Sequence, residues 1–270
     1  MTADPSLALA SWLGAHALWV FWALLCILLL LVTSFAWLWR FHVLPHAQST
    51  FSPPVRLLLH LAAGFAVVVA GAAGFAEIAE GLAPGGAMSL VDEAVTASIH
   101  THVGARTLQA FALLTYFGDA RVLAALGVAV ALWLFWRGER TLGLGWLLAL
   151  VGNGLLNPVL KRIFERVRPV HDYGGGGELG WSFPSGHTSG ATVAYGMLAY
   201  VMLRTLPGRW QLPGVLCATV MAFTVGSSRV FLQVHFVSDV VAGFASGIAW
   251  LTVCVASVAL IDRRRIARSR

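Results

Sequence analysis

Residues 5 to 39 contain no Asp, Glu, Lys or Arg, and this long uncharged run limits what the chain can fold into. About 20 apolar residues suffice for a helix to cross the hydrocarbon core of a bilayer. The basic leader and cleavage site of a signal peptide are not recognisable here, so we expect a retained transmembrane helix. Only 11% of the 270 residues are charged, against about a quarter in soluble domains. The composition therefore indicates an integral membrane protein.

Seven apolar stretches of suitable length predict an all-α, polytopic membrane bundle. They are residues 17–39, 57–79, 120–136, 141–160, 187–206, 212–229 and 236–261. A transmembrane β-barrel would show alternation instead of such runs. Residues 80–119 are too polar to cross the bilayer and too apolar for a free linker, which predicts an interfacial helix on the outer side.

The basic residues predict an orientation with the N-terminus outside and the C-terminus inside. Most of the 18 Lys and Arg residues then lie in inner loops and in the tail, as the positive-inside rule requires. The positive charge is explained in this way as a topology signal, and no nucleic-acid partner is expected. Five basic residues nevertheless gather on the disfavoured outer side, which indicates a use for them there: Lys161, Arg162, Arg166, Arg168 and Arg229.

Two polar segments lie at the end of the fourth predicted span and at the start of the fifth. In the first, Lys161 and Arg168 are seven residues apart and would share one face of a continued helix, although Pro169 disfavours helix at Arg168. In the second, Ser185 and Gly186 would open a helix whose free N–H groups suit an anion, and His187 follows in its first turn. The glycines at 174–177 are interpreted as a flexible rim. A basic helix end and an ordinary capped helix remain the simpler alternatives for each segment alone.

A third polar segment contains Arg229, His235 and Asp239 near the last predicted loop. His235 and Asp239 are four residues apart, so on a helix the carboxylate would accept a hydrogen bond from one imidazole nitrogen and leave the other free to react. Lipid-facing positions for such residues would cost about 2.5 to 3.5 kcal/mol each. Under the predicted topology all three segments reach the outer face, where their cations, N–H donors and histidines would suit a phosphate dianion.

The spacing of these residues resembles the three-part signature of the type 2 phosphatidic acid phosphatase (PAP2) superfamily. The matching motifs are K-x6-RP from Lys161 to Pro169, PSGH from Pro184 to His187, and SR-x5-H-x3-D from Ser228 to Asp239. The resemblance implies a six-helix membrane core with one additional N-terminal helix. The expected division is residues 1–56 for that helix and a cytoplasmic loop, 57–261 for the phosphatase domain, and 262–270 for a basic tail.

The resemblance also implies roles for the site residues. His235 would be the nucleophile that forms a phosphohistidine, Asp239 would orient it, and His187 would be the acid and then the base. Phosphate oxygens would be bound by a second set: Lys161, Arg168, Ser185, Gly186 and Arg229. No metal and no cofactor are expected, since side-chain cations neutralise the charge.

The expected function is hydrolysis of a lipid phosphate or pyrophosphate at the periplasmic face of the plasma membrane. Phosphatidate, phosphatidylglycerol phosphate, undecaprenyl pyrophosphate and lipid A phosphates all remain open as substrates. A lipid phosphotransferase would use the same residues, so it is the main alternative. A non-enzymatic transporter or lipid-binding protein and an intramembrane serine protease based on Ser185 are further alternatives, and the oligomeric state is open.

Overall fold

The computed structural model describes residues 4–43, 51–82, 86–169 and 180–268, and every regular element within these ranges is a helix. In chain order the elements are α1 (Pro5–Ala15), α2 (Ala17–Leu38), η1 (Trp39–Val43), α4 (Pro53–Glu80), α5 (Ala87–His102), α6 (Ala105–Leu114), η2 (Thr115–Gly118), α7 (Ala120–Trp136), α8 (Arg140–Phe164), α9 (Gly186–Thr205), α10 (Gly208–Phe231) and α11 (Val237–Arg268). The prediction of an all-α fold is confirmed.

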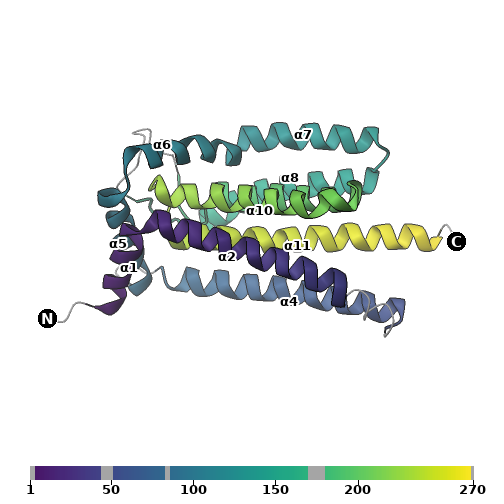
Figure 1. Cartoon of the computed structure of the whole chain (residues 1–270), viewed down its shortest axis with the longest axis horizontal. Helices are drawn as coiled ribbons and strands as arrows, with labels where there is room; N and C mark the ends of the chain where they lie inside the picture. The colour runs from purple at the N-terminus through teal and green to yellow at the C-terminus, as the bar shows by residue number, and fades with distance from the viewer. Residues whose placement is uncertain (1–3, 44–50, 83–85, 170–179, 269–270) are drawn as a thin grey trace.

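The long helices lie side by side in one elongated bundle, and α1 lies at the opposite end of it from the last turns of α11 (Figure 1). Within the described residues, five helices are long and apolar enough to cross a membrane, namely α2 continued into η1, α4, α8, α10 and α11. The run from α6 through α7, bent by 44°, would add a sixth. All seven apolar stretches are thus helical, while the count of seven spans stays a prediction.

Helix α9 accounts for the difference between six and seven. It has 20 residues, but its first turns carry polar side chains such as Thr188, Ser189 and Thr192, all of which are buried. The helix packs against α8, α10 and α11. Because protein surrounds it on several sides, α9 does not need the apolar surface that lipid would demand of a span.

The outer segment that was expected as one interfacial helix consists of two, α5 and α6, which are followed by η2. Helices α1 and α5 lie crosswise over one end of the bundle (Figure 1), and Ser98 on α5 donates to the carbonyl of Ser11 on α1 at 2.6 Å. On the next helix, α2, the ring of Phe21 packs against Phe111 and Phe231. The additional N-terminal helix is therefore packed against α6 and α10.

Candidate active site

The first polar segment begins in helix α8 and ends outside it. Helix α8 ends at Phe164, and Glu165 takes a left-handed backbone conformation with φ 43°. Lys161 remains in the last helical turn, whereas Arg168 lies in the irregular segment that follows. The two cations do not share one helical face, because the turn at Glu165 redirects the chain; the helix does not continue to Arg168, as Pro169 led us to expect. The rings of Phe75, Phe164 and Phe183 pack together and hold this turn against α4.

The second polar segment forms the helix start that its sequence predicted. Helix α9 begins at Gly186, and Ser185 is its buried N-cap residue. The hydroxyl of Thr188 donates to Ser185 Oγ at 2.9 Å. The backbone N–H of Ser185 donates to the carbonyl of Asp239 at 3.0 Å, which ties this helix start to the third segment. His187 lies in the first turn of α9.

The third polar segment brings His235 and Asp239 together without placing both on a helix. Helix α11 begins only at Val237, so His235 lies in the turn before it, yet its Nδ1 is 3.3 Å from Asp239 Oδ2. The same carboxylate oxygen accepts the Phe236 N–H at 2.9 Å. A residue in the first helical turn that reaches back to the N–H before the helix stabilises the helix start. Asp239 therefore caps α11 and orients His235 in one arrangement.

Contacts between the first and third segments give the two imidazole nitrogens different surroundings. Arg168 Nη1 lies 3.2 Å from His235 Nε2 and donates to the carbonyl of Val234 at 2.8 Å. Nδ1 faces the carboxylate and Nε2 faces a guanidinium. An arrangement of this kind fixes the imidazole orientation and places the Nε2 lone pair where a phosphate attracted by Arg168 would sit.

Arg229 is 3% exposed and lies near the end of α10. Its Nη1 donates to Thr115 Oγ1 at 2.8 Å, and its carbonyl accepts the N–H of His235 at 3.2 Å. The three polar segments predicted to converge are thus linked by hydrogen bonds at one end of the bundle. The glycines at 174–177 lie outside the described residues.

Two residues that the sequence interpretation did not assign to the site support Asp239, Arg166 by a direct contact and Asp92 through Arg166 and Ser238. Arg166 donates to Asp239 Oδ1 at 2.7 Å and to Asp92 Oδ2 at 2.8 Å. Asp92 lies on α5, is 2% exposed, and also accepts hydrogen bonds from the backbone N–H and hydroxyl of Ser238. Helix α5 therefore connects the irregular segment after α8 to the start of α11. A surplus of outer-side arginines was the only sequence signal for Arg166.

Ser182 is a third residue that the interpretation missed. It is fully buried, its hydroxyl donates to Asp239 Oδ2, and its Oγ lies 3.2 Å from His235 Nδ1. Its backbone N–H donates to the carbonyl of Arg166 at 2.7 Å. A serine one position before an aromatic residue in a loop carries no sequence signal for such a role.

His235 lies between the membrane-spanning helices α10 and α11 and is 1% exposed. Burial lowers the pKa of His235 from 6.5 to about 4, and the charges of Arg168 and Arg229 act in the same direction, while Asp239 opposes them. The imidazole is therefore neutral at neutral pH, which is the form that can act as a nucleophile.

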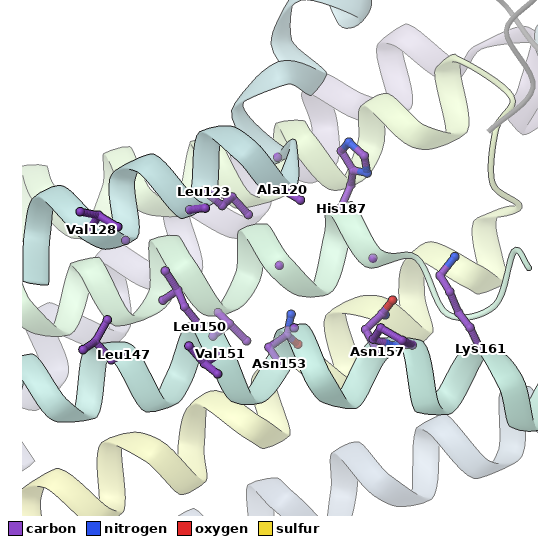
Figure 2. Close-up of a pocket in the computed structure, with 18 of the residues that line it drawn as sticks. Ala120, Leu123, Val128, Leu147, Leu150, Val151, Asn153, Asn157, Lys161 and His187 are labelled. Carbon is purple, nitrogen blue, oxygen red and sulfur yellow. The ribbon is translucent and has the colours of Figure 1, made fainter. Parts of the chain in front are cut away.

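A cavity of about 570 Å³ opens from this cluster along the bundle. Lys161, His187 and His235 line its polar end. Figure 2 shows Lys161 rising from α8 and His187 on the first turn of α9, with apolar side chains of α7 and α8 farther along. The other lining residues are mostly apolar, including Leu123, Val128, Leu147, Leu150 and Val151. The cavity thus combines a charged end with an apolar groove.

Comparison with known proteins finds a match to the PAP2 superfamily model over residues 142–262. Phosphatidylglycerophosphatase B of Bacillus subtilis is 38% identical over 142 residues, covering 50% of this chain and 67% of that protein. The lipid A 1-phosphatase of Rhizobium etli is 32% identical over 173 residues, covering 54% of this chain and 68% of that protein. The resemblance inferred from the three motifs is confirmed.

A solved structure agrees with the fold as well. The crystal structure of a transmembrane PAP2 type phosphatidylglycerolphosphate phosphatase from Bacillus subtilis superposes with a TM-score of 0.66 at 31% identity. The match covers 73% of this chain and 96% of that chain. At this level of identity and coverage, the architecture of the bundle is shared with a membrane phosphatase.

Proposed function

Because this chain belongs to the PAP2 superfamily and is a multi-pass membrane phosphatase, we propose that it hydrolyses a lipid phosphate at the outer membrane face through a phosphohistidine. The observation that carries the proposal is the different environment of the two His235 nitrogens. Nδ1 lies 3.3 Å from Asp239 and Nε2 lies 3.2 Å from Arg168. A neutral imidazole held in this way presents one lone pair toward a cation-lined space, as an in-line attack on phosphorus requires.

In the first step, the Nε2 lone pair of His235 forms a bond to phosphorus while the bond from phosphorus to the lipid oxygen breaks. His187, which lines the same cavity, gives its proton to that leaving oxygen. In the second step, His187 takes a proton from water as the water oxygen attacks phosphorus. The nitrogen to phosphorus bond then breaks, which releases inorganic phosphate and restores both histidines.

The phosphate oxygens are held by cations and by a helix start. Lys161, Arg168 and Arg229 supply positive charge, while Ser185 and the Gly186 N–H supply donors at the first turn of α9. Donors placed before the reaction stabilise the added charge of the transition state without reorganisation. The lipid chains lie in the apolar groove between α7 and α8.

The outer-face assignment is supported by the distribution of Arg and Lys, most of which fall at the opposite end of the bundle. That assignment gives the location as the plasma membrane with the site on its extracytoplasmic side. A water-soluble short-chain lipid phosphate added to sealed vesicles tests it. Right-side-out vesicles should hydrolyse the substrate without permeabilisation, whereas inverted vesicles should require detergent.

The catalytic assignment is tested with the purified protein in detergent and EDTA. Phosphate release is measured from phosphatidate, phosphatidylglycerol phosphate, undecaprenyl pyrophosphate and lipid A 1-phosphate. His235→Ala should reduce the rate at least about a thousandfold, since the covalent step is lost. Exposed Leu155→Ala on the lipid side of α8 is the matched control and should keep wild-type activity. Retained activity in His235→Ala would refute the nucleophile assignment.

A phosphotransferase is distinguished from a hydrolase by following a lipid substrate whose phosphate group carries a radioactive label. Hydrolysis gives labelled inorganic phosphate, whereas transfer gives a labelled acceptor lipid with little free phosphate. His187→Ala should lower both products, because the first step needs an acid for the leaving oxygen and the second step needs a base for water.

A further inference from the structure

The groove that runs from the catalytic histidines contains one feature that phosphate chemistry does not explain. Its lining extends along α8 from Lys161 to Leu147, a distance of about 21 Å at the rise of an α-helix. Most side chains beyond the histidines are apolar, but Asn153 also lines the groove. Figure 2 shows Asn153 on the groove side of α8, between Val151 and Asn157.

The two asparagines of α8 differ in their hydrogen bonds. Asn157 is 8% exposed and donates from Nδ2 to Ser189 Oγ at 3.2 Å. Asn153 is 7% exposed, and no residue in the described part of the chain forms a hydrogen bond with its side chain. Although little of the residue is exposed, its amide atoms are not sealed off from the groove that it lines, so they need a partner there. Its place on the wall of an open groove indicates a partner that enters from outside.

The position of Asn153 relative to the reacting phosphate follows from helix α9. A Cβ added at Gly186 would lie 3.0 Å from Asn157 Oδ1, and one added at Gly190 would lie 3.9 Å from Asn153 Nδ2. Asn153 therefore faces α9 at the level of Gly190, three residues beyond His187. Three residues correspond to about 4.5 Å along the helix axis. The absence of side chains at both glycines keeps space open beside the two amides.

We propose that Asn153 hydrogen-bonds a carbonyl of an ester-linked or amide-linked acyl chain next to the substrate phosphate, so that the site selects acylated lipid phosphates over polyprenyl phosphates. The inference rests on the proposed function, since it places the phosphate between His187 and His235. In an acylated lipid phosphate, a carbonyl group lies only a few bonds from phosphorus, at the depth of Asn153. A polyprenyl phosphate has only hydrocarbon there and would leave the amide unpaired. Sites built to hydrogen-bond a substrate group reject analogues that lack it.

The first experiment compares substrates on the wild-type protein in detergent. Diacyl phosphatidate is paired with its dialkyl ether analogue of equal chain length, and a polyprenyl phosphate forms the third arm. One hydrogen bond to a neutral group corresponds to roughly a tenfold preference in kcat/KM for the ester over the ether. An ester-to-ether ratio near one would overturn the proposal without any variant being needed.

The second experiment changes the amide while keeping its shape. Asn153→Leu should lower kcat/KM for the diacyl substrate about tenfold and bring the ester-to-ether ratio close to one. For polyprenyl phosphate kcat/KM should not fall, because the amide that this substrate leaves unpaired is gone. Asn157→Leu is the matched contrast. Asn157 already bonds Ser189 beside the catalytic residues. Its loss should therefore lower kcat/KM for all three substrates alike and leave the ester-to-ether ratio unchanged.

The outcomes separate the subsite from the proposed function. If Asn153→Leu and Asn153→Ala lower kcat/KM equally for all three substrates, the role of Asn153 is structural. The proposed carbonyl subsite is then wrong, while the phosphatase function stands. If the wild type releases phosphate from none of these lipids, the proposed function fails and the subsite with it. Thermal unfolding in detergent shows which variants are folded. If neither Asn153 variant is folded, the ester-to-ether ratio of the wild-type protein decides whether the subsite exists.

Discussion

Two ion pairs in this protein have the same length and opposite surroundings. Arg166 contacts Asp239 at 2.7 Å at the active-site end, and Arg204 contacts Asp262 at 2.7 Å near the C-terminal end of the bundle. The side chains of the first pair are 11% and 0% exposed, whereas those of the second are 43% and 24% exposed. Distance alone therefore does not tell what an ion pair contributes; the neighbouring groups decide it.

The neighbours of the buried pair show why it persists. Arg166 also contacts Asp92 and Ser238, and its guanidinium lies 4.2 Å from the ring centroid of Phe236. Each ion is thus taken out of water only where other partners replace the water. Arg204 also donates a hydrogen bond to the hydroxyl of Tyr200, and its side chain remains partly exposed. The buried pair belongs to a network that positions His235, while the exposed pair joins two helix ends.

The largest effect is expected from breaking the buried pair. Arg166→Ala leaves Asp92 and Asp239 buried without their cation, which should lower the free energy of unfolding by about 3 to 5 kcal/mol. It should also reduce kcat, because Asp239 loses the contact that holds it beside His235. The midpoint of thermal unfolding and phosphate release in detergent measure both. A variant with unchanged stability would contradict the network described above.

Arg166→Lys separates charge from geometry at the same position. A lysine keeps the positive charge but cannot bridge both carboxylates with a planar fork. Stability should therefore recover in part, while kcat remains low. Full recovery of kcat would show that Arg166 acts through charge alone and does not position Asp239.

An intermediate effect is expected from pH. The pKa of His235 is lowered to about 4 from 6.5 by burial, so below pH 6.5 the unfolded chain takes up a proton that the folded site does not. The contribution of this pKa difference to the free energy of unfolding is complete above pH 6.5 and is lost as the pH falls toward 4. Between pH 6.5 and 5 the loss amounts to about 2 kcal/mol.

The measurement compares unfolding midpoints of the wild type and His235→Gln between pH 7.5 and 4.5. The glutamine variant lacks the titrating group, so its midpoint should fall less steeply with decreasing pH. Parallel curves would mean that His235 is protonated alike in both states. That result would contradict the lowering of the His235 pKa by burial.

The smallest effect is expected from the exposed pair. Arg204→Ala should change the free energy of unfolding by less than about 1 kcal/mol, because water solvates both groups once the pair is broken. Phosphate release should equal that of the wild type, since Arg204 lies at the far end of the bundle from His235. A loss comparable to that of Arg166→Ala would break the comparison between the two regions.

Motif residues and supporting residues differ in how visible they were in the sequence. Lys161, Arg168 and His235 stood out as costly charges in an apolar chain, and their spacing matched a family signature. Asp92 and Ser182 carried no such signal. Each contacts the site across a large separation in sequence, such as the 146 residues between Asp92 and Ser238. Contacts of this kind depend on how helices pack, which local patterns do not specify.

Local geometry also departed from the spacing rules in two places. Lys161 and Arg168 would share one face only on a continued helix, but α8 ends at Phe164. His235 and Asp239 were expected on one helix, but α11 starts at Val237. In both cases the side chains still reach the site. The reason is that tertiary contacts, such as that of Arg168 with the Val234 carbonyl, position them in place of the helix.

The sequence by itself determined the helical membrane architecture, the family and the residue types of the site, because apolar length and the high cost of intramembrane charge are local properties. Only the tertiary structure decided which charges are buried together, where α9 lies among its neighbours, and that Asn153 has an open groove before it while Asn157 has a partner. The physical reason is that burial and hydrogen-bond pairing are properties of packed surfaces. Two arginines that each form an ion pair of 2.7 Å can therefore differ in burial as Arg166 and Arg204 do.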